Sequence, residues 1–113
     1  MKSFTYALEG IRVCLKEQNF KFHIVAGIIA TILGIFTQLT RVEWMVLCIV
    51  IGLVLMAEMF NTAIEKVVDL VSPDIHPLAK AAKDISAAAV LVIASVSVII
   101  GILIFIPKWL SLF

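Results

Sequence analysis

The 113-residue sequence contains little charge of either sign. Asp, Glu, Lys and Arg make up 15% of it, and the formal net charge is +1. This balance excludes a strongly basic surface, so we expect no nucleic-acid partner. By contrast, 63% of the residues are hydrophobic and the mean hydropathy is +1.16, well above the ~45–50% apolar content of soluble domains. The composition predicts one membrane-embedded domain over residues 1–113.

Cysteine, glycine and proline are also scarce, with two, five and three residues respectively. Cys14 and Cys48 are far apart and neither belongs to a CxxC pair, so no metal-binding or redox role is expected of them. The glycines form neither a P-loop nor a kinase glycine-rich loop, so any ATP binding must do without these phosphate cradles. Residues 1–23 carry charges throughout, which argues against a cleaved signal peptide.

Three apolar runs predict three membrane-spanning helices, because a span needs ~20 residues. We place them at about residues 22–39, 43–65 and 84–106. The first two are joined by a short turn and should form a helical hairpin. The second connection contains Pro73 and Pro77, which end one helix and suit the first turn of the next. The predicted fold class is therefore an all-α integral membrane protein with three transmembrane helices.

Residues 3–22 precede the first span and are amphipathic. Phe4, Leu8, Ile11 and Leu15 recur near helical spacing, and the charged side chains fall largely on other faces. This pattern predicts an amphipathic helix lying in the membrane interface. A soluble arm is the alternative, and the aromatic residues disfavour it.

The distribution of basic residues predicts the orientation in the membrane. Seven of the nine Lys and Arg residues precede the first span or lie between the second and third; only Arg41 and Lys108 lie on the other side. By the positive-inside rule, the N-terminus and the long connection are cytoplasmic. We therefore expect a multi-pass cell-membrane protein whose acidic segment faces the compartment that contains ATP.

Polar residues at the end of the second span fall on one face of a helix. At ~100° per residue this face is about three turns long. Its members are Glu58, Asn61, Thr62, Glu65 and Asp69. Because a carboxylate facing lipid is costly, we expect this face to contact protein or a hydrated cleft.

Two further polar sets lie at the same predicted depth. The start of the third span carries His76, Lys80, Lys83, Asp84 and Ala87, and the N-terminal helix carries Arg12, Lys16 and Glu17. Carboxylates with lysines beside them suit a magnesium–phosphate site, and a carboxylate at the membrane boundary can accept a proton from a lipid hydroxyl. The competing interpretation is that such charges only solvate helix ends and pair with one another. We prefer it for Lys66 and Lys80, and His76 fits either interpretation.

Three segments resemble the prokaryotic diacylglycerol kinase family: ExxNTAIExxVD at 58–69, HPLAKxAKDIxAAAV at 76–90 and KEQNFKFH at 16–23. The resemblance extends over about residues 4–107, and HPLAKAAKD is similar to the Gram-positive branch, whose members are mainly undecaprenol kinases. It implies a homotrimer that transfers the γ-phosphate of ATP to a lipid hydroxyl with Mg²⁺.

The same resemblance implies roles for individual residues. Glu58 and Asn61 would be catalytic, with Glu58 as the base. Glu17 and Glu65 would hold magnesium, and Glu58 and Ala87 would contact the lipid substrate. The nucleotide would be bound by Tyr6, Glu17, Glu65, Asp69, Asp74, Ile75, His76, Lys83 and Asp84.

The function that we expect is therefore ATP- and Mg²⁺-dependent phosphorylation of undecaprenol to undecaprenyl phosphate. The alternative within this class is a diacylglycerol kinase that makes phosphatidic acid. Outside it, a small holin-like or transporter-accessory protein would also have three spans, but it would leave the charged faces unexplained. A proton or cation pathway is disfavoured because the acids cluster at one end of the helices.

Overall fold

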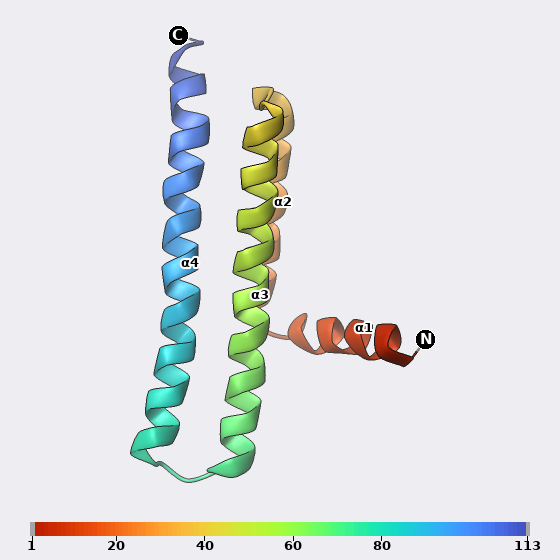
Figure 1. Ribbon diagram of the computed structural model, residues 1–113, viewed down its shortest axis with the longest axis vertical. Helices are drawn as coiled ribbons and strands as arrows, with labels where there is room; N and C mark the ends of the chain where they lie inside the picture. Colours follow the sequence, from red (N-terminus) through yellow and green to blue (C-terminus); the bar gives the residue numbers. More distant parts are fainter. Residues whose placement is uncertain (1, 113) are drawn as a thin grey trace.

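The computed structural model describes residues 2–112, which form four helices. They are α1 (Lys2–Cys14), α2 (Gln18–Thr37), α3 (Arg41–Val71) and α4 (Pro77–Leu110). The last three are long and apolar enough to cross a membrane, so the prediction of three spans is confirmed as far as helix length and composition can show it. They run side by side along the long axis of the molecule, whereas α1 lies across it (Figure 1).

Helices α3 and α4 are longer than the predicted spans. They contain 31 and 34 residues, which correspond to about 46 and 51 Å, against a hydrocarbon thickness of ~30 Å. Both continue through the charged segments until the connection 72–76 interrupts them. Their joined ends extend past α1 (Figure 1). We call this the loop end of the bundle, and the opposite end, which holds the α2–α3 turn, the hairpin end.

The N-terminal helix is shorter than predicted. The sequence predicts a continuous helix over residues 3–22, but α1 ends at Cys14 and residues 15–17 form a turn and a bend. Glu17 has an extended backbone (φ −83°, ψ 131°) and precedes the first turn of α2. The break is needed because α1 runs across the bundle and α2 runs along it (Figure 1). Residues 18–22 thus lengthen the first span.

The predicted hairpin between the first two spans is present. Gln38 adopts a left-handed conformation (φ 60°) that ends α2. Thr40 then caps α3. Its hydroxyl accepts from the Glu43 backbone N–H at 3.2 Å, and its own N–H donates to Glu43 Oε1 at 2.9 Å. A Cβ at Gly34 would lie 2.8 Å from the Trp44 ring, so glycine permits the close approach of these two helices.

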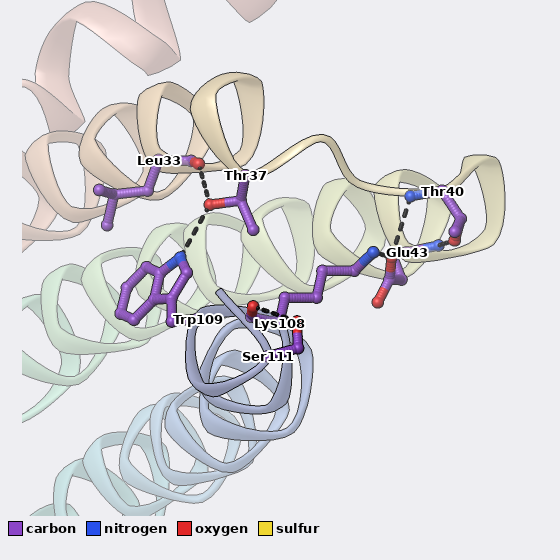
Figure 2. Close-up of polar contacts among 7 residues, drawn as sticks. All are labelled: Leu33, Thr37, Thr40, Glu43, Lys108, Trp109 and Ser111. Atoms are coloured by element: carbon purple, nitrogen blue, oxygen red, sulfur yellow. Dashed lines mark hydrogen bonds and ion pairs between the residues drawn. The ribbon is translucent and has the colours of Figure 1, made fainter. Parts of the chain in front are cut away.

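Side-chain contacts between distant segments join the three spans at the hairpin end (Figure 2). The Trp109 indole N–H donates to the Thr37 hydroxyl at 3.0 Å, and Lys108 Nζ lies 3.0 Å from Glu43 Oε1. We call these four residues the hairpin-end clasp. The Phe105 ring packs against Trp109, and Phe105 belongs to a buried cluster with Leu47 and Ile104. The clasp therefore sits directly beyond the apolar core.

One buried stripe runs along α3 and determines where the polar site lies. Leu47, Val50 and Val54 occupy it toward the hairpin end, and Glu58 and Asn61 continue it toward the loop end. These positions recur every three or four residues, so they share one helix face. The face that packs the core is thus the same face that carries the first buried acid.

Candidate functional site

Glu58 is a buried acid at the junction between the apolar and polar parts of α3. It is only 3% exposed, and Asn61 and Thr62 beside it are also buried. The Thr62 hydroxyl donates to the Glu58 backbone carbonyl at 3.0 Å, while the Asn61 side-chain amide donates to Glu65 Oε1 at 3.2 Å. The expectation that this face meets protein is confirmed at Glu58, Asn61 and Thr62.

The side-chain oxygen of Asn61 has no hydrogen-bond partner within residues 2–112, although it is buried. A buried acceptor without a partner is unusual and calls for a donor or a cation. Glu65 lies beside it. Mg²⁺ commonly takes one or two protein oxygens and completes its shell with phosphate oxygens and water. Among the described residues, no group of three His, Cys, Asp or Glu side chains could hold a metal by itself. These donors fit Mg²⁺ accompanied by a phosphate ligand.

A groove of about 380 Å³ lies at the loop end, between α3, the connection 72–76 and α4. It brings together five of the residues expected to bind nucleotide, namely Asp69, Asp74, Ile75, His76 and Lys83. Ser72, Pro73, Ala79 and Lys80 complete the lining. The Lys83 ammonium forms an ion pair with the Asp69 carboxylate across the groove, which ties α4 to α3.

Local hydrogen bonds order the connection that forms the floor of this groove. His76 caps α4, with its Nδ1 accepting from the Leu78 backbone N–H at 3.1 Å and Pro77 at the first helical position, as predicted. The Ser72 hydroxyl donates to the Asp74 carbonyl at 3.1 Å. Since Nδ1 is an acceptor, a neutral His76 carries its proton on Nε2. The remaining ring nitrogen is therefore a hydrogen-bond donor.

Three residues with predicted roles lie neither in the groove lining nor beside Glu58. Tyr6 is on α1 and is 69% exposed. The Asp84 carboxylate accepts from Lys80 Nζ at 2.6 Å on the exposed side of α4, which agrees with the pairing interpretation of Lys80. Ala87 is exposed on the same helix. In this single chain, Tyr6, Asp84 and Ala87 are not brought together with Glu58, and their roles remain predictions.

The bend between α1 and α2 lies against α3 near Glu58. Glu17 is half-buried and lies within electrostatic range of the Glu58 carboxylate. Cys14 is buried, and Glu17, Lys66 and Glu58 all lie close enough to act on its thiol. Arg12 instead pairs with Glu9 on the exposed surface of α1, at 3.1 Å. Of the polar residues Arg12, Lys16 and Glu17, Glu17 is therefore the one that lies near Glu58.

One residue of this site, His23, is not predicted by the sequence pattern. His23, on α2, places its Nε2 4.0 Å from Glu58 Oε1, and both side chains are largely buried. In the sequence, His23 is simply a polar residue at the start of an apolar run. Its depth matches that of Glu58, but α2 is apolar on nearly every face, so the pattern gives no sign of which side faces α3.

Comparison with known proteins agrees with this geometry. The family model of prokaryotic diacylglycerol kinase matches residues 5–105. The chain is 48% identical over 108 residues to undecaprenol kinase of Bacillus subtilis. This alignment covers 95% of this chain and 88% of that protein. It is 39% identical over 112 residues to a diacylglycerol kinase of Synechocystis, covering 97% of this chain but 64% of the relative.

A third relative is diacylglycerol kinase of Escherichia coli K12, 32% identical over 100 residues, which covers 88% of this chain and 82% of that protein. The matched region includes all four helices apart from the ends of α1 and α4. The prediction of a lipid kinase is therefore confirmed at the level of the family. The chain belongs to the prokaryotic diacylglycerol kinase family.

Proposed function

We propose that this protein is an undecaprenol kinase that transfers the γ-phosphate of ATP to the hydroxyl group of the membrane lipid. The observation that carries the proposal is the position of Glu58. Its carboxylate is buried where the apolar stripe of α3 gives way to polar residues, and the groove at the loop end lies further along the same helix. A lipid alcohol approaching within the membrane and a nucleotide approaching from water would meet at this point.

Glu58 is the proposed general base. The lipid oxygen attacks the γ-phosphorus, a new oxygen–phosphorus bond forms, and the bond between the γ-phosphorus and the β–γ bridging oxygen breaks. The hydroxyl proton passes to the Glu58 carboxylate, and ADP leaves with the bridging oxygen. A base at hydrogen-bond distance from the attacking hydroxyl contributes typically ~10²–10⁴-fold to such a step. Burial of Glu58 keeps competing water away from the acceptor position.

The nucleotide is proposed to lie along α3. Glu58 and Asp69 are about 16 Å apart along the helix axis, at ~1.5 Å per residue. The adenosine part therefore occupies the groove lined by Asp74, Ile75 and His76, and the γ-phosphate reaches Asn61 and Glu65. Lys83 would exchange its Asp69 partner for phosphate, since a lysine ammonium binds phosphate as a point charge.

Glu65 and the Asn61 side-chain oxygen would hold Mg²⁺, with Glu17 as a further candidate from the bend. Bound there, the ion would neutralise charge on the transferring phosphate. The protein side chains in turn fix where the phosphate lies, because Asn61 is held by its hydrogen bond to Glu65.

We further propose that the loop end faces the cytoplasm and that the protein is a homotrimer. The first point is supported by the excess of Lys and Arg at the loop end and around α1. The second is supported by the exposure of Asp84, Ala87 and Tyr6, which a neighbouring subunit could bring to the site.

Diacylglycerol is the second candidate substrate, because two of the relatives are named diacylglycerol kinases. The greater identity to an undecaprenol kinase favours undecaprenol. Both alcohols would use the same base and the same nucleotide site, so the choice between them concerns the acceptor alone.

The test is phosphate transfer from γ-labelled ATP by the purified protein, with undecaprenol and diacylglycerol supplied in parallel. We expect stronger labelling of undecaprenol, complete dependence on Mg²⁺, and no turnover by Glu58→Gln although it still binds ATP. Preferential labelling of diacylglycerol would replace the proposed substrate. Turnover by a folded Glu58→Gln variant would refute the role of Glu58.

A further inference from the structure

His23 is the basic side chain closest to the Glu58 carboxylate. Within residues 2–112, no other Lys, Arg or His lies within ion-pair distance of that carboxylate. The separation of 4.0 Å between Nε2 and Oε1 exceeds a hydrogen bond but is within reach of one bridging water or a small rotation of the imidazole ring. The side chains are 16% and 4% exposed, respectively, so solvent screens the contact poorly.

The other polar groups near Glu58 are directed elsewhere. The Asn61 amide donates to Glu65, and the Thr62 hydroxyl donates to the main chain of residue 58, not to its carboxylate. Glu17 and Glu65 lie within electrostatic range, and as anions they repel a charged Glu58. A buried carboxylate needs a partner to remain charged and fixed in direction. His23 is placed to supply that partner.

His23 also lines a small apolar cavity between the three spans. The cavity has a volume of about 120 Å³ and is lined mostly by small and aliphatic residues, including Gly27, Ala30 and Val54. His23 is thus adjacent both to the Glu58 carboxylate and to an apolar cavity. An edge-on contact with the Phe22 ring, with centroids 5.5 Å apart, further restricts the orientation of the imidazole.

We infer that His23 is a positioning residue for the phosphoryl transfer. It holds the Glu58 carboxylate in the direction from which it accepts the proton of the lipid hydroxyl, and it is the basic side chain facing a carboxylate that Glu17 and Glu65 also approach. His23 does not contact the nucleotide groove, whose lining is supplied by α3, α4 and their connection. This inference rests on the proposed role of Glu58 as the base.

The test measures kcat and the KM for ATP in detergent-solubilised protein for His23→Ala, His23→Gln and the control Val25→Ala. Val25 lies two residues away on the exposed surface of α2. We expect His23→Ala to lower kcat about 10–100-fold with the KM for ATP changed less than twofold. His23→Gln, which can hydrogen-bond but not become charged, should retain part of the lost activity, and Val25→Ala should resemble the unmodified protein.

A double-mutant cycle separates positioning from a general structural effect. Glu58→Asp withdraws the carboxylate by one methylene, so His23→Ala should cause at most a further twofold loss in that background. Full 10–100-fold losses in both backgrounds, or an equal rise in the KM for ATP, would overturn the inference. The inference would also be overturned if His23→Ala were as active as the unmodified protein. His23→Gln supplies the same comparison if His23→Ala does not fold, as judged by thermal unfolding.

Comparing Glu58→Gln with His23→Ala distinguishes a failure of this inference from a failure of the proposed function. If Glu58→Gln is inactive while His23→Ala is fully active, the base assignment stands and only the role of His23 is refuted. If Glu58→Gln retains turnover, the proposed base is wrong and the inference falls with it.

Discussion

Trp109 donates its indole N–H to the hydroxyl of Thr37 at 3.0 Å, although 72 positions separate the two residues in the sequence. The bond joins the last turn of α4 to the last turn of α2. The Thr37 hydroxyl in turn donates to the Leu33 carbonyl at 2.6 Å (Figure 2). The clasp at the hairpin end is thus the place where all three spans are held together by specific polar contacts.

Removing this bond should lower stability without affecting the site. Trp109→Phe keeps an aromatic ring against Phe105 but loses the donor. Interhelical hydrogen bonds in membrane proteins contribute about 0.6 kcal/mol on average and up to about 1.7 kcal/mol. We expect a lower Tm in detergent and an unchanged kcat below the transition. Thr37→Val should cause a similar loss, and the double variant should be little worse than either. Additive losses would show that the two side chains are not coupled.

Glu43 combines two roles that substitutions can separate. It caps α3 together with Thr40 and pairs with Lys108. Gln can serve in the same capping box but carries no charge. Glu43→Gln should therefore lower the Tm less than Glu43→Ala, which loses both the cap and the pair. Measured unfolding of the two variants in the same detergent checks the order. An equal Tm for both variants would mean that loss of the ion pair with Lys108 accounts for the whole change in Tm.

The glycines in the spans should tolerate alanine to different degrees. At Gly34 a Cβ would lie 2.8 Å from the rigid Trp44 ring, whereas at Gly52 nothing lies within 4 Å. Gly34→Ala should cost about 1–3 kcal/mol through overpacking. Gly52→Ala should be neutral or stabilise by up to about 1 kcal/mol through helix propensity. Thermal unfolding of both variants, with Gly27→Ala as an intermediate case, measures the difference. A Gly34→Ala protein as stable as Gly52→Ala would contradict the observed packing.

Lys83 should govern nucleotide affinity. It lies in the groove at the loop end and pairs with Asp69. Lys83→Met should raise the KM for ATP about tenfold or more, because a buried or half-buried charge-assisted contact to phosphate is worth about 1.5–3 kcal/mol. Lys2→Met removes an exposed lysine at the start of α1 that does not line the groove, and it serves as the control. Equal effects of both variants would point to a general loss of positive charge.

Cys14 should react slowly with alkylating reagents at neutral pH. Burial raises the pKa of the Cys14 thiol, and the nearby Glu17 carboxylate raises it further. A higher pKa leaves less thiolate at neutral pH, so alkylation of Cys14 should be slow and should speed up only at pH values above the ordinary thiol range. A Cys48→Ala protein isolates this reaction. The rate of maleimide labelling against pH measures it, and rapid labelling at neutral pH would contradict the buried position.

The sequence predicted the three spans, the hairpin and the polar face of α3, because each depends on local hydropathy or helical spacing. It did not predict the break after Cys14. No Gly or Pro marks residues 15–17, and the change of direction results from how α1 lies relative to the bundle. The helical spacing of Glu58 to Asp69 and the position of Pro77 also predicted that α3 and α4 continue beyond the apolar segments.

The residues of the candidate site were likewise predictable where they depend on helical spacing and not where they depend on how the helices pack. Glu58, Asn61 and Thr62 could be predicted as a buried set because they share one face of one helix. The pairing of His23 with Glu58 depends on how α2 is rotated about its own axis, and a helix that is apolar all round carries no signal for that rotation. Likewise, only the packing of α4 on α3 distinguishes Lys83, which faces the groove, from Asp84, which does not.

The clasp joins α3 and α4 at the hairpin end, and the Asp69–Lys83 pair joins them at the loop end. Their ends are pinned together near Lys108, and Lys83 lies about 37 Å away along α4 at ~1.5 Å per residue. Over that length, a rotation of about 3° at the pinned end moves Lys83 by about 2 Å, enough to part it from Asp69. The width of the nucleotide groove therefore depends on the angle between α3 and α4, which the Asp69–Lys83 pair holds at the loop end.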